Sequence, residues 1–366
     1  MKPLWRTVGI AGGVLGAAVT GVALGAGAHG IRVARQRRGT DDPYADEPLG
    51  VLEPSRESTV VADDGQPISC EEVDPEDGGT PDLTVVLVPG YTLDRRCWHF
   101  QRRDLARLGG PRVRQVLYDQ RGHGRSGLGC AESSTIEQLG SDLDAVLRAL
   151  VPDGPIVLAG HSMGGMTIMA LAEQRPELFA QRIRGVAFVA TSAGDVGRSG
   201  LPRPMLAKHN PATLALGFAA QWQPDLVERV RRAGGPITWS VIRAIAFGDR
   251  QVSPSLVDLM ASMIDGTSLK VITDFTKTIG AHSRYRVLAT LRRCRVLVIG
   301  GDSDRITPFW HAEAIATELP DAHLVRVEGA GHMVMLERER LVTGHLVELV
   351  RQCVKGTGGQ DRWRRS

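Results

Sequence analysis

Ser162 lies in the stretch GHSMG (160–164), which follows the apolar run PIVLAG (155–160) and precedes a stretch with helical periodicity. A serine at a sharp turn from strand to helix projects its hydroxyl above the edge of a sheet, and flanking glycines allow the crowded backbone of that turn. The free N–H groups at the start of the following helix favour a developing negative charge. This setting predicts a nucleophile, the alternative being a small residue in a tight turn.

Two later strand ends carry the side chains that a serine nucleophile needs. Asp304 follows the apolar run CRVLVIGG (294–301), and His332 follows the run AHLVRVEG (322–329). A serine hydroxyl requires a base to remove its proton, and an imidazole base requires a carboxylate that orients it and stabilises its charge. We predict Asp304 as this carboxylate, with Asp302 and Asp195 as the alternatives.

The elements that must position these residues are visible as short apolar runs that alternate with amphipathic stretches. Such runs, separated by helices, predict a parallel sheet covered on both faces. In this kind of sheet reactive groups gather at the carboxyl ends of the strands. The expected strands are 59–64, 67–73, 83–88, 113–118, 155–160, 183–190, 294–301 and 322–329.

The region from about residue 57 to 353 resembles the α/β-hydrolase fold. The chain order of nucleophile, acid and histidine is that of the family, and DQRGHGRS (119–126) is similar to a loop that precedes its nucleophile strand. The resemblance implies an α/β protein with a mostly parallel, doubly wound sheet and a helical lid inserted after the sixth strand. It also implies Ser162 as the nucleophile, His332 as general base and then acid, and Asp304 as the orienting carboxylate.

The same resemblance implies an oxyanion hole formed by the backbone N–H groups of Tyr91 and Met163. Pro89 stands where family members often have histidine, but the N–H of Tyr91 is still available. Four further polar residues are expected to support structure, either by pairing with carboxylates or by packing in the loop and beside the turn: Arg121, Arg125, His123 and His161.

The expected reaction is hydrolysis of a carboxylic ester of an apolar or medium-chain acid through an acyl-enzyme. Thioester hydrolysis, cofactor-free perhydrolysis of the haloperoxidase kind and carbon–carbon bond hydrolysis are alternatives on the same triad, and a ligand receptor on this fold is an alternative of another class. The sequence contains no metal cluster, phosphate loop or dinucleotide fingerprint, so we expect no cofactor and no metal. Five side chains either line an acyl pocket or form the core of the insertion: Trp239, Phe247, Met260, Met263 and Phe275.

Composition sets broad limits on partners. The chain has 366 residues, 42% of them hydrophobic, and a net charge of +3, which indicates no general affinity for nucleic acid. Its five cysteines are dispersed, so a disulfide framework or a zinc site is not expected. The reaction expected from the resemblance implies a small-molecule ester as the partner, and the sequence leaves the oligomeric state open.

Residues 7–31 contain no Asp, Glu, Lys or Arg and are long enough to cross a bilayer as a helix. Basic residues flank this segment on both sides, so the orientation stays open. We predict a single membrane anchor and a location at the cell membrane; a cleaved signal peptide with secretion, or a Gly/Ala-rich tail, are the alternatives. The expected organisation is an anchor with a basic flank (1–40), an acidic linker (41–56), the hydrolase core (57–192 and 286–353), a helical lid (193–285) and a basic tail (354–366).

Overall fold

The computed structural model describes residues 30–197 and 235–355, in which eight strands form one sheet. The strand order is β1-β2-β4-β3-β5-β6-β7-β8. β2 pairs antiparallel with both β1 and β4, and every other pair in the sheet is parallel. The predicted mostly parallel sheet is therefore confirmed. The strands are β1 (Arg56–Val61), β2 (Pro67–Val73), β3 (Leu83–Val88), β4 (Val113–Tyr118), β5 (Ile156–His161), β6 (Ile183–Val189), β7 (Arg295–Gly301) and β8 (His323–Val327).

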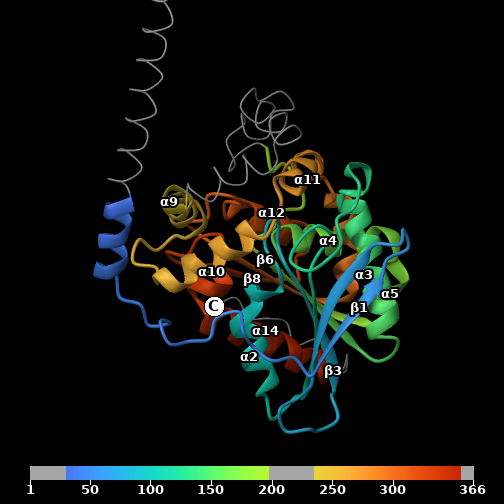
Figure 1. Ribbon diagram of the computed structural model, residues 1–366. Helices are drawn as coiled ribbons and strands as arrows, with labels where there is room; N and C mark the ends of the chain where they lie inside the picture. Colours follow the sequence, from blue (N-terminus) through green and yellow to red (C-terminus); the bar gives the residue numbers. More distant parts are fainter. Residues whose placement is uncertain (1–29, 198–234, 356–366) are drawn as a thin grey trace, which may run out of the picture.

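Helices cover both faces of the sheet. Helices α2 and α14 lie on one face, and α3, α4, α5 and α12 lie on the other (Figure 1). The bounds of these helices and of the short helix α13 are α2 (His99–Ala106), α3 (Ile136–Leu150), α4 (Met163–Gln174), α5 (Pro176–Gln181), α12 (Trp310–Glu318), α13 (Val334–Glu337) and α14 (Glu339–Val354). Three 3-10 helices complete this part: η1 (Arg95–Trp98), η2 (Ala131–Ser133) and η3 (Tyr285–Arg293).

The apolar strands explain why the sheet is covered twice. Leu87 of β3 packs in the core on one face, and its neighbours Val86 and Val88 pack in the core on the other. Successive side chains of a strand point to opposite faces, so a strand buried on both faces needs an unbroken apolar run. All six residues of LTVVLV in β3 are buried accordingly.

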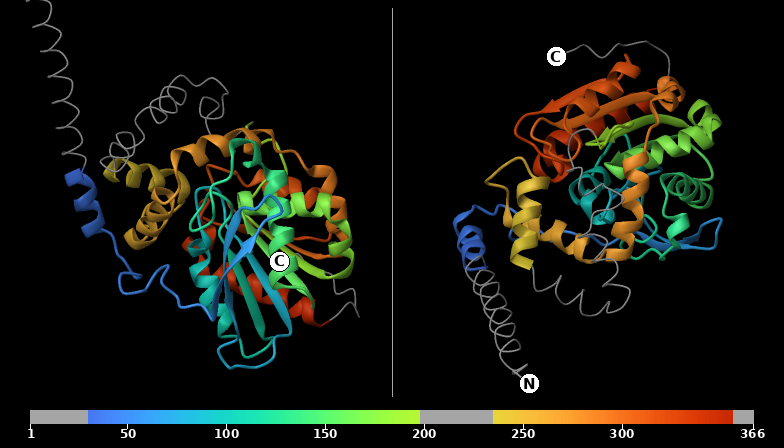
Figure 2. Two further views of the ribbon diagram at one scale, coloured as in Figure 1. Left: turned by 45° about the vertical axis from the view of Figure 1, so that its right-hand side comes forward. Right: turned by 90° about the horizontal axis from the view of Figure 1, so that it is seen from above.

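A helical insertion follows the sixth strand. Its described helices are α9 (Gly235–Ala246), α10 (Pro254–Asp265) and α11 (Leu269–Ala281). They lie together at one end of the sheet (Figure 2). Residues 198–234, which belong to the lid range expected from the sequence, lie outside the described residues.

The prediction of a membrane location needs correction. No helix within 30–197 and 235–355 is long and apolar enough to cross a bilayer. Of the expected anchor, residues 7–31, only residues 30 and 31 are described. They begin a helix, residues 30–39, that contains four arginines. One of these, Arg37, is ion-paired with Asp258 of α10, so this helix packs on the insertion.

Residues 41–56, expected to be an acidic linker, pack along α2 and α10. The ring of Tyr44 lies 5.1 Å from that of Phe100. The carboxylate of Glu47 accepts hydrogen bonds from Nε2 of His99 at 2.9 Å and from Arg103 at 2.8 Å. Glu47 therefore pairs with basic groups of α2, and the carboxylate of Asp42 accepts hydrogen bonds from the hydroxyls of Ser253 and Ser255 at the start of α10.

Candidate active site

Ser162 occupies a strained turn between β5 and α4. Its φ of 52° and ψ of −117° are unfavourable for any residue other than glycine. The end of the neighbouring strand β6 holds this conformation, because the Ser162 N–H donates to the carbonyl of Val189 at 3.0 Å and the Ser162 carbonyl accepts from the Thr191 hydroxyl at 2.6 Å. Strain that the surroundings enforce in this way is typical of functional sites.

Two glycines make this turn possible. A Cβ on Gly164 would lie 2.3 Å from the carbonyl oxygen of Val88, and a Cβ on Gly160 would lie 2.6 Å from the backbone of Gly164. Both contacts are with backbone, which cannot move aside as a flexible side chain can. The spacing of glycines around Ser162 therefore reflects the close approach of β3, β5 and α4.

His332 and Asp304 meet at the carboxyl edge of the sheet. Nδ1 of His332 donates to Oδ2 of Asp304 at 2.9 Å, while Oδ1 of Asp304 accepts the backbone N–H groups of Ile306 and Thr307 at 2.7 and 2.9 Å. Burial on its own raises the pKa of Asp304, but His332 and these hydrogen bonds outweigh it and hold the pKa below its ordinary value. Asp304 is thus a buried carboxylate that fixes the tautomer of His332.

The alternatives to Asp304 face elsewhere. Oδ1 of Asp302 accepts the backbone N–H of Gly329 at 2.9 Å in an exposed turn. Asp195 has a positive φ of 61° and its carboxylate lies 3.4 Å from the hydroxyl of Tyr285. Of these three carboxylates, Asp304 is the one bonded to His332.

His161 connects the turn at Ser162 with residues 328–333, the loop between β8 and α13 that carries His332 and is called the histidine loop below. Its Nε2 donates to the backbone carbonyl of His332 at 3.0 Å, and the two rings lie 4.8 Å apart. Burial lowers the pKa of His161 to about 3, so the ring is neutral. Gly90 leaves room for it, since a Cβ there would lie 2.6 Å from Nδ1 of His161. His161 therefore packs beside the turn, as predicted.

Tyr91 and Met163 present backbone N–H groups near Ser162. Met163 is the first residue of α4, whose initial N–H groups have no partner within the helix. Neither N–H donates to an acceptor within the described part of the chain. The Tyr91 hydroxyl donates to the Ile272 carbonyl of α11, and burial raises the pKa of this phenol to about 12. Tyr91 therefore remains protonated and ties its loop to the insertion.

Ser162, Tyr91 and Met163 all border one cavity of about 50 Å³. Apolar walls come from four residues that sequence reasoning missed: Met166, Val196, Ile279 and Ile306. A sequence signal existed for Met166, because it lies one helical turn after Ser162 and hence on the same side of α4. Val196 and Ile279 come from segments distant in sequence, which no local pattern relates to Ser162.

The five side chains proposed for an acyl pocket do not border this cavity. They are buried in two places: Trp239, Phe247, Met260 and Met263 in the large core that α2, α14 and the insertion share, and Phe275 in a smaller cluster with Met163 and Met166. Helical periodicity identified their buried face correctly. It could not show whether that face packs on the sheet or on a ligand site.

A family model described as the alpha/beta hydrolase family matches residues 85–343, which is most of the chain. The chain belongs to this family. Among solved structures, a thermophilic esterase from Thermogutta terrifontis has a TM-score of 0.63 at 24% identity, covering 82% of this chain and 99% of that one. An enol-lactonase from Burkholderia xenovorans LB400 has a TM-score of 0.62 at 21% identity, with 80% and 99% coverage. These two likenesses show the fold.

The sequence of this alpha/beta hydrolase aligns with those of three curated relatives. It is 27% identical to a pimeloyl-[acyl-carrier protein] methyl ester esterase of Aromatoleum aromaticum, over 70% of this chain and 92% of the relative. It is 24% identical to the acetyltransferase component of the acetoin cleaving system of Pseudomonas putida and 26% identical to a polyketide synthase of Burkholderia thailandensis. The alignments span only 65% and 12% of the length of these last two proteins.

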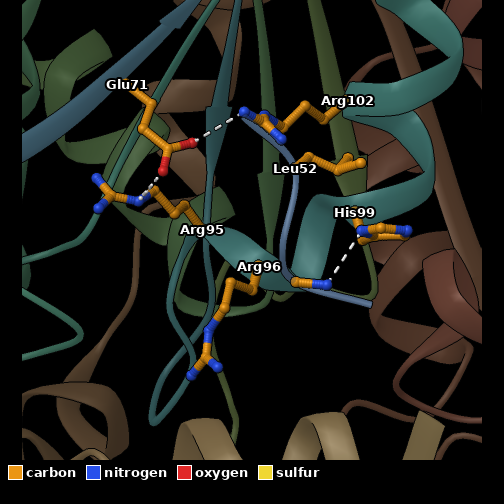
Figure 3. Close-up of a pocket in the computed structure, with 7 residues that line it drawn as sticks. Leu52, Glu71, Arg95, Arg96, His99 and Arg102 are labelled. Atoms are coloured by element: carbon orange, nitrogen blue, oxygen red, sulfur yellow. Dashed lines mark hydrogen bonds and ion pairs between the residues drawn. The ribbon is translucent and has the colours of Figure 1, made fainter. Parts of the chain in front are cut away.

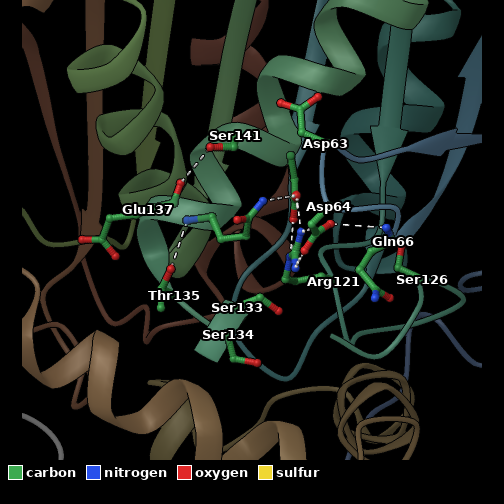
Figure 4. Close-up of polar contacts among 12 residues, drawn as sticks. Asp63, Asp64, Gln66, Arg121, Ser126, Ser133, Ser134, Thr135, Glu137 and Ser141 are labelled. Atoms are coloured by element: carbon green, nitrogen blue, oxygen red, sulfur yellow. Dashed lines mark hydrogen bonds and ion pairs between the residues drawn. The ribbon is translucent and has the colours of Figure 1, made fainter. Parts of the chain in front are cut away.

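The loop 119–126 of this alpha/beta hydrolase has a structural role. Arg121 is fully buried and bonds to Asp142 at 2.5 and 2.6 Å and to Asp64 at 2.7 Å (Figure 4). Burial alone lowers the pKa of Arg121, but its hydrogen bonds to Asp142 and Asp64 raise it above the usual range. Arg125 pairs with Glu57 at 2.8 Å. The predicted pairing of both arginines with carboxylates is confirmed.

A second cavity of about 20 Å³ lies beside α2 in this hydrolase (Figure 3). Glu71 lies at 3.0 Å from Arg95 and 3.5 Å from Arg102 within it. Its lining includes none of the residues predicted for catalysis. The cavity that Ser162 borders is therefore the candidate active site.

Proposed function

We propose that this alpha/beta hydrolase is a serine hydrolase that cleaves carboxylic esters through an acyl-enzyme. The observation that carries the proposal is the convergence at one cavity of the strained Ser162 and the backbone N–H groups of Tyr91 and Met163. Beside them Asp304 holds His332 in the tautomer that leaves Nε2 able to accept a proton. These are the nucleophile, oxyanion donors and oriented base that acyl transfer requires.

In the first half of the reaction, the Ser162 oxygen attacks the ester carbonyl carbon while Nε2 of His332 takes the hydroxyl proton. The carbonyl oxygen becomes an oxyanion that accepts the N–H groups of Tyr91 and Met163. By comparison with donors removed from other enzymes, each such hydrogen bond stabilises the transition state by about 3–4 kcal/mol. The tetrahedral intermediate then collapses, and His332 returns the proton to the departing alcohol, which leaves an acyl group on Ser162.

In the second half, His332 takes a proton from water, whose oxygen attacks the acyl carbon. Collapse of this intermediate breaks the bond to Ser162, and His332 reprotonates the serine as the acid leaves. Asp304 stays ionised throughout and stabilises the imidazolium, in agreement with its lowered pKa. The reaction draws on no group beyond these side chains, two backbone N–H groups and water.

The walls of the cavity favour an apolar acyl group. Met166, Val196 and Ile279 offer no charge to a substrate, and a cavity of about 50 Å³ suits a short chain better than a long one. The relative named as a methyl ester esterase supports an ester substrate, because it aligns over 92% of its length.

The test uses p-nitrophenyl esters from two to twelve acyl carbons, together with a fluorophosphonate probe that labels activated serines. Wild type should hydrolyse the shorter esters and become labelled, and Ser162→Ala should do neither. Ser192→Ala is the matched control, because Ser192 also contacts an imidazole, Nδ1 of His311 at 2.8 Å, but is fully buried. It should be labelled like wild type. Wild-type protein that is silent and unlabelled would remove the catalytic interpretation and favour a ligand receptor.

A further inference from the structure

Glu337 joins two segments that are distant in the sequence. It ends α13, five residues after His332, and its side chain is buried. Oε2 accepts the backbone N–H of Gly331 at 2.7 Å, and Oε1 accepts those of Gly248 and Asp249 at 2.9 and 2.5 Å. One carboxylate thus bonds the residue just before His332 and the start of the connection between α9 and α10.

The two segments also touch through their backbones. A Cβ on Gly248 would lie 2.4 Å from the Gly329 carbonyl oxygen, and a Cβ on Gly331 would lie 2.5 Å from the Gly248 nitrogen. On the other side of His332, the N–H of Met333 donates to the carbonyl of Ala246 at 3.0 Å. The end of α9 therefore contacts the histidine loop both before and after His332.

A carboxylate is a costly group to place in this position. Burial raises the pKa of Glu337, while the three backbone N–H groups and the charge of Arg338 act in the opposite direction. Arg338 itself lies 3.6 Å from Asp249, so the charges around the carboxylate belong to the same two segments. A buried carboxylate with several N–H donors holds its partners in one geometry, because losing any of these bonds leaves a buried group unsatisfied.

We propose that Glu337 is a positioning residue for His332, which clamps the histidine loop to the base of the insertion and so aims the imidazole at Ser162. The inference rests on the proposed function, since it assigns Glu337 a part in the same reaction. Glu337 borders none of the substrate cavity and acts through the loop backbone. According to this proposal, the connection between α9 and α10 helps to fix the position of His332.

Glu337→Gln tests the proposal because the amide has the same shape but only one acceptor oxygen. Its NH2 group must then face at least one of the three N–H donors, which pushes the loop out of position. A displacement of about 1 Å at a reacting group costs up to about 100-fold in rate. We expect kcat on a p-nitrophenyl ester to fall about 10- to 100-fold while KM stays within about two-fold. Glu337→Asp, which keeps the charge, should recover part of kcat.

The matched control is Glu72→Gln, the same chemical change in another buried carboxylate. Glu72 lies on β2 and pairs with Arg56 and Arg114, away from the histidine loop. The variant Glu72→Gln should lower the thermal midpoint and leave kcat unchanged. Wild-type kcat in Glu337→Gln with a lowered thermal midpoint would show a purely structural role and overturn the proposal.

Gly248→Ala alters the same contact from the side of the insertion and leaves the Glu337 carboxylate unchanged. It should lower kcat with little change in KM, because the added Cβ collides with the backbone of the histidine loop. If Glu337→Gln does not fold, this variant decides, and an unchanged kcat would overturn the proposal. Wild-type protein that hydrolyses no ester would instead mark failure of the proposed function.

Discussion

Replacing Asp304 with asparagine should abolish most activity without unfolding the protein. Oδ1 of Asp304 accepts two backbone N–H groups, from Ile306 and Thr307, whereas Oδ2 faces Nδ1 of His332 and the Thr307 hydroxyl, each at 2.9 Å. In the variant the amide oxygen must stay with the two N–H donors, so the NH2 group faces His332. The Thr307 hydroxyl can accept from that NH2 group and donate to the carbonyl of Ala190 at 3.0 Å, so every partner remains satisfied.

The cost falls on the tautomer of His332. An NH2 group opposite Nδ1 makes that nitrogen an acceptor, which moves the ring proton to Nε2, the atom that takes the proton from Ser162 in the proposed reaction. The equivalent change in a serine protease lowers kcat by about 10⁴-fold through the same tautomer error. At 1.36 kcal/mol for each factor of ten, this corresponds to about 5 kcal/mol in the activation free energy.

The assay is kcat on a short-chain p-nitrophenyl ester for wild type, Asp304→Asn and Asp302→Asn, with thermal melts of all three. Asp302 is the matched control, since it lies two residues away and accepts a hydrogen bond from Gly329 in an exposed turn. We expect a loss of about 10⁴-fold for Asp304→Asn alone, with melting unchanged. A loss of less than about tenfold, or an equal loss in both variants, would refute the assignment of Asp304.

Arg121→Met leaves the buried Asp142 without its partner and should lower the free energy of unfolding by about 3–5 kcal/mol in urea denaturation. The double variant with Asp142→Leu should recover most of this loss, and no recovery would argue against an ion-pair origin. Burial lowers the pKa of His123 to about 4, so the unfolded chain binds a proton on this ring more readily than the folded chain does. The contribution of the neutral ring to stability is therefore complete above about pH 6.5 and is lost as pH falls toward 4. Thermal midpoints should decrease over that range, less steeply in His123→Gln, and equal slopes would contradict this origin. Met166→Phe narrows the cavity and should shift the optimum of kcat/KM to shorter esters, whereas an unchanged optimum would place the acyl group elsewhere.

Much of the fold followed from local patterns. The apolar runs at 83–88 and 113–118 became β3 and β4 with the bounds expected. A strand buried on both faces must be apolar at every position, which makes it readable without knowledge of its neighbours. The turn at Ser162 was equally local, because a strand, its glycines and a helix lie together within about twenty residues.

Other features depended on which surfaces meet in space. Met260 and Phe247 have the periodicity of buried residues, but the structure places them in the core and leaves the walls of the cavity to Val196 and Ile279. The basic helix at residues 30–39 packs on α9 and α10, a contact that its composition alone did not indicate. Helical periodicity indicates that one face of a helix is buried, but it does not indicate which element covers that face.

The sequence by itself determined the type of sheet and the order in which Ser162, Asp304 and His332 leave their strands, because strand burial and strand-end placement are properties of short segments. The tertiary structure decided that Asp304 rather than Asp302 reaches His332. It also decided that Glu337 bonds Gly248, 89 positions earlier in the chain. Both contacts join groups that are far apart in the sequence and a few ångströms apart in space, so they depend on the packing of the whole chain.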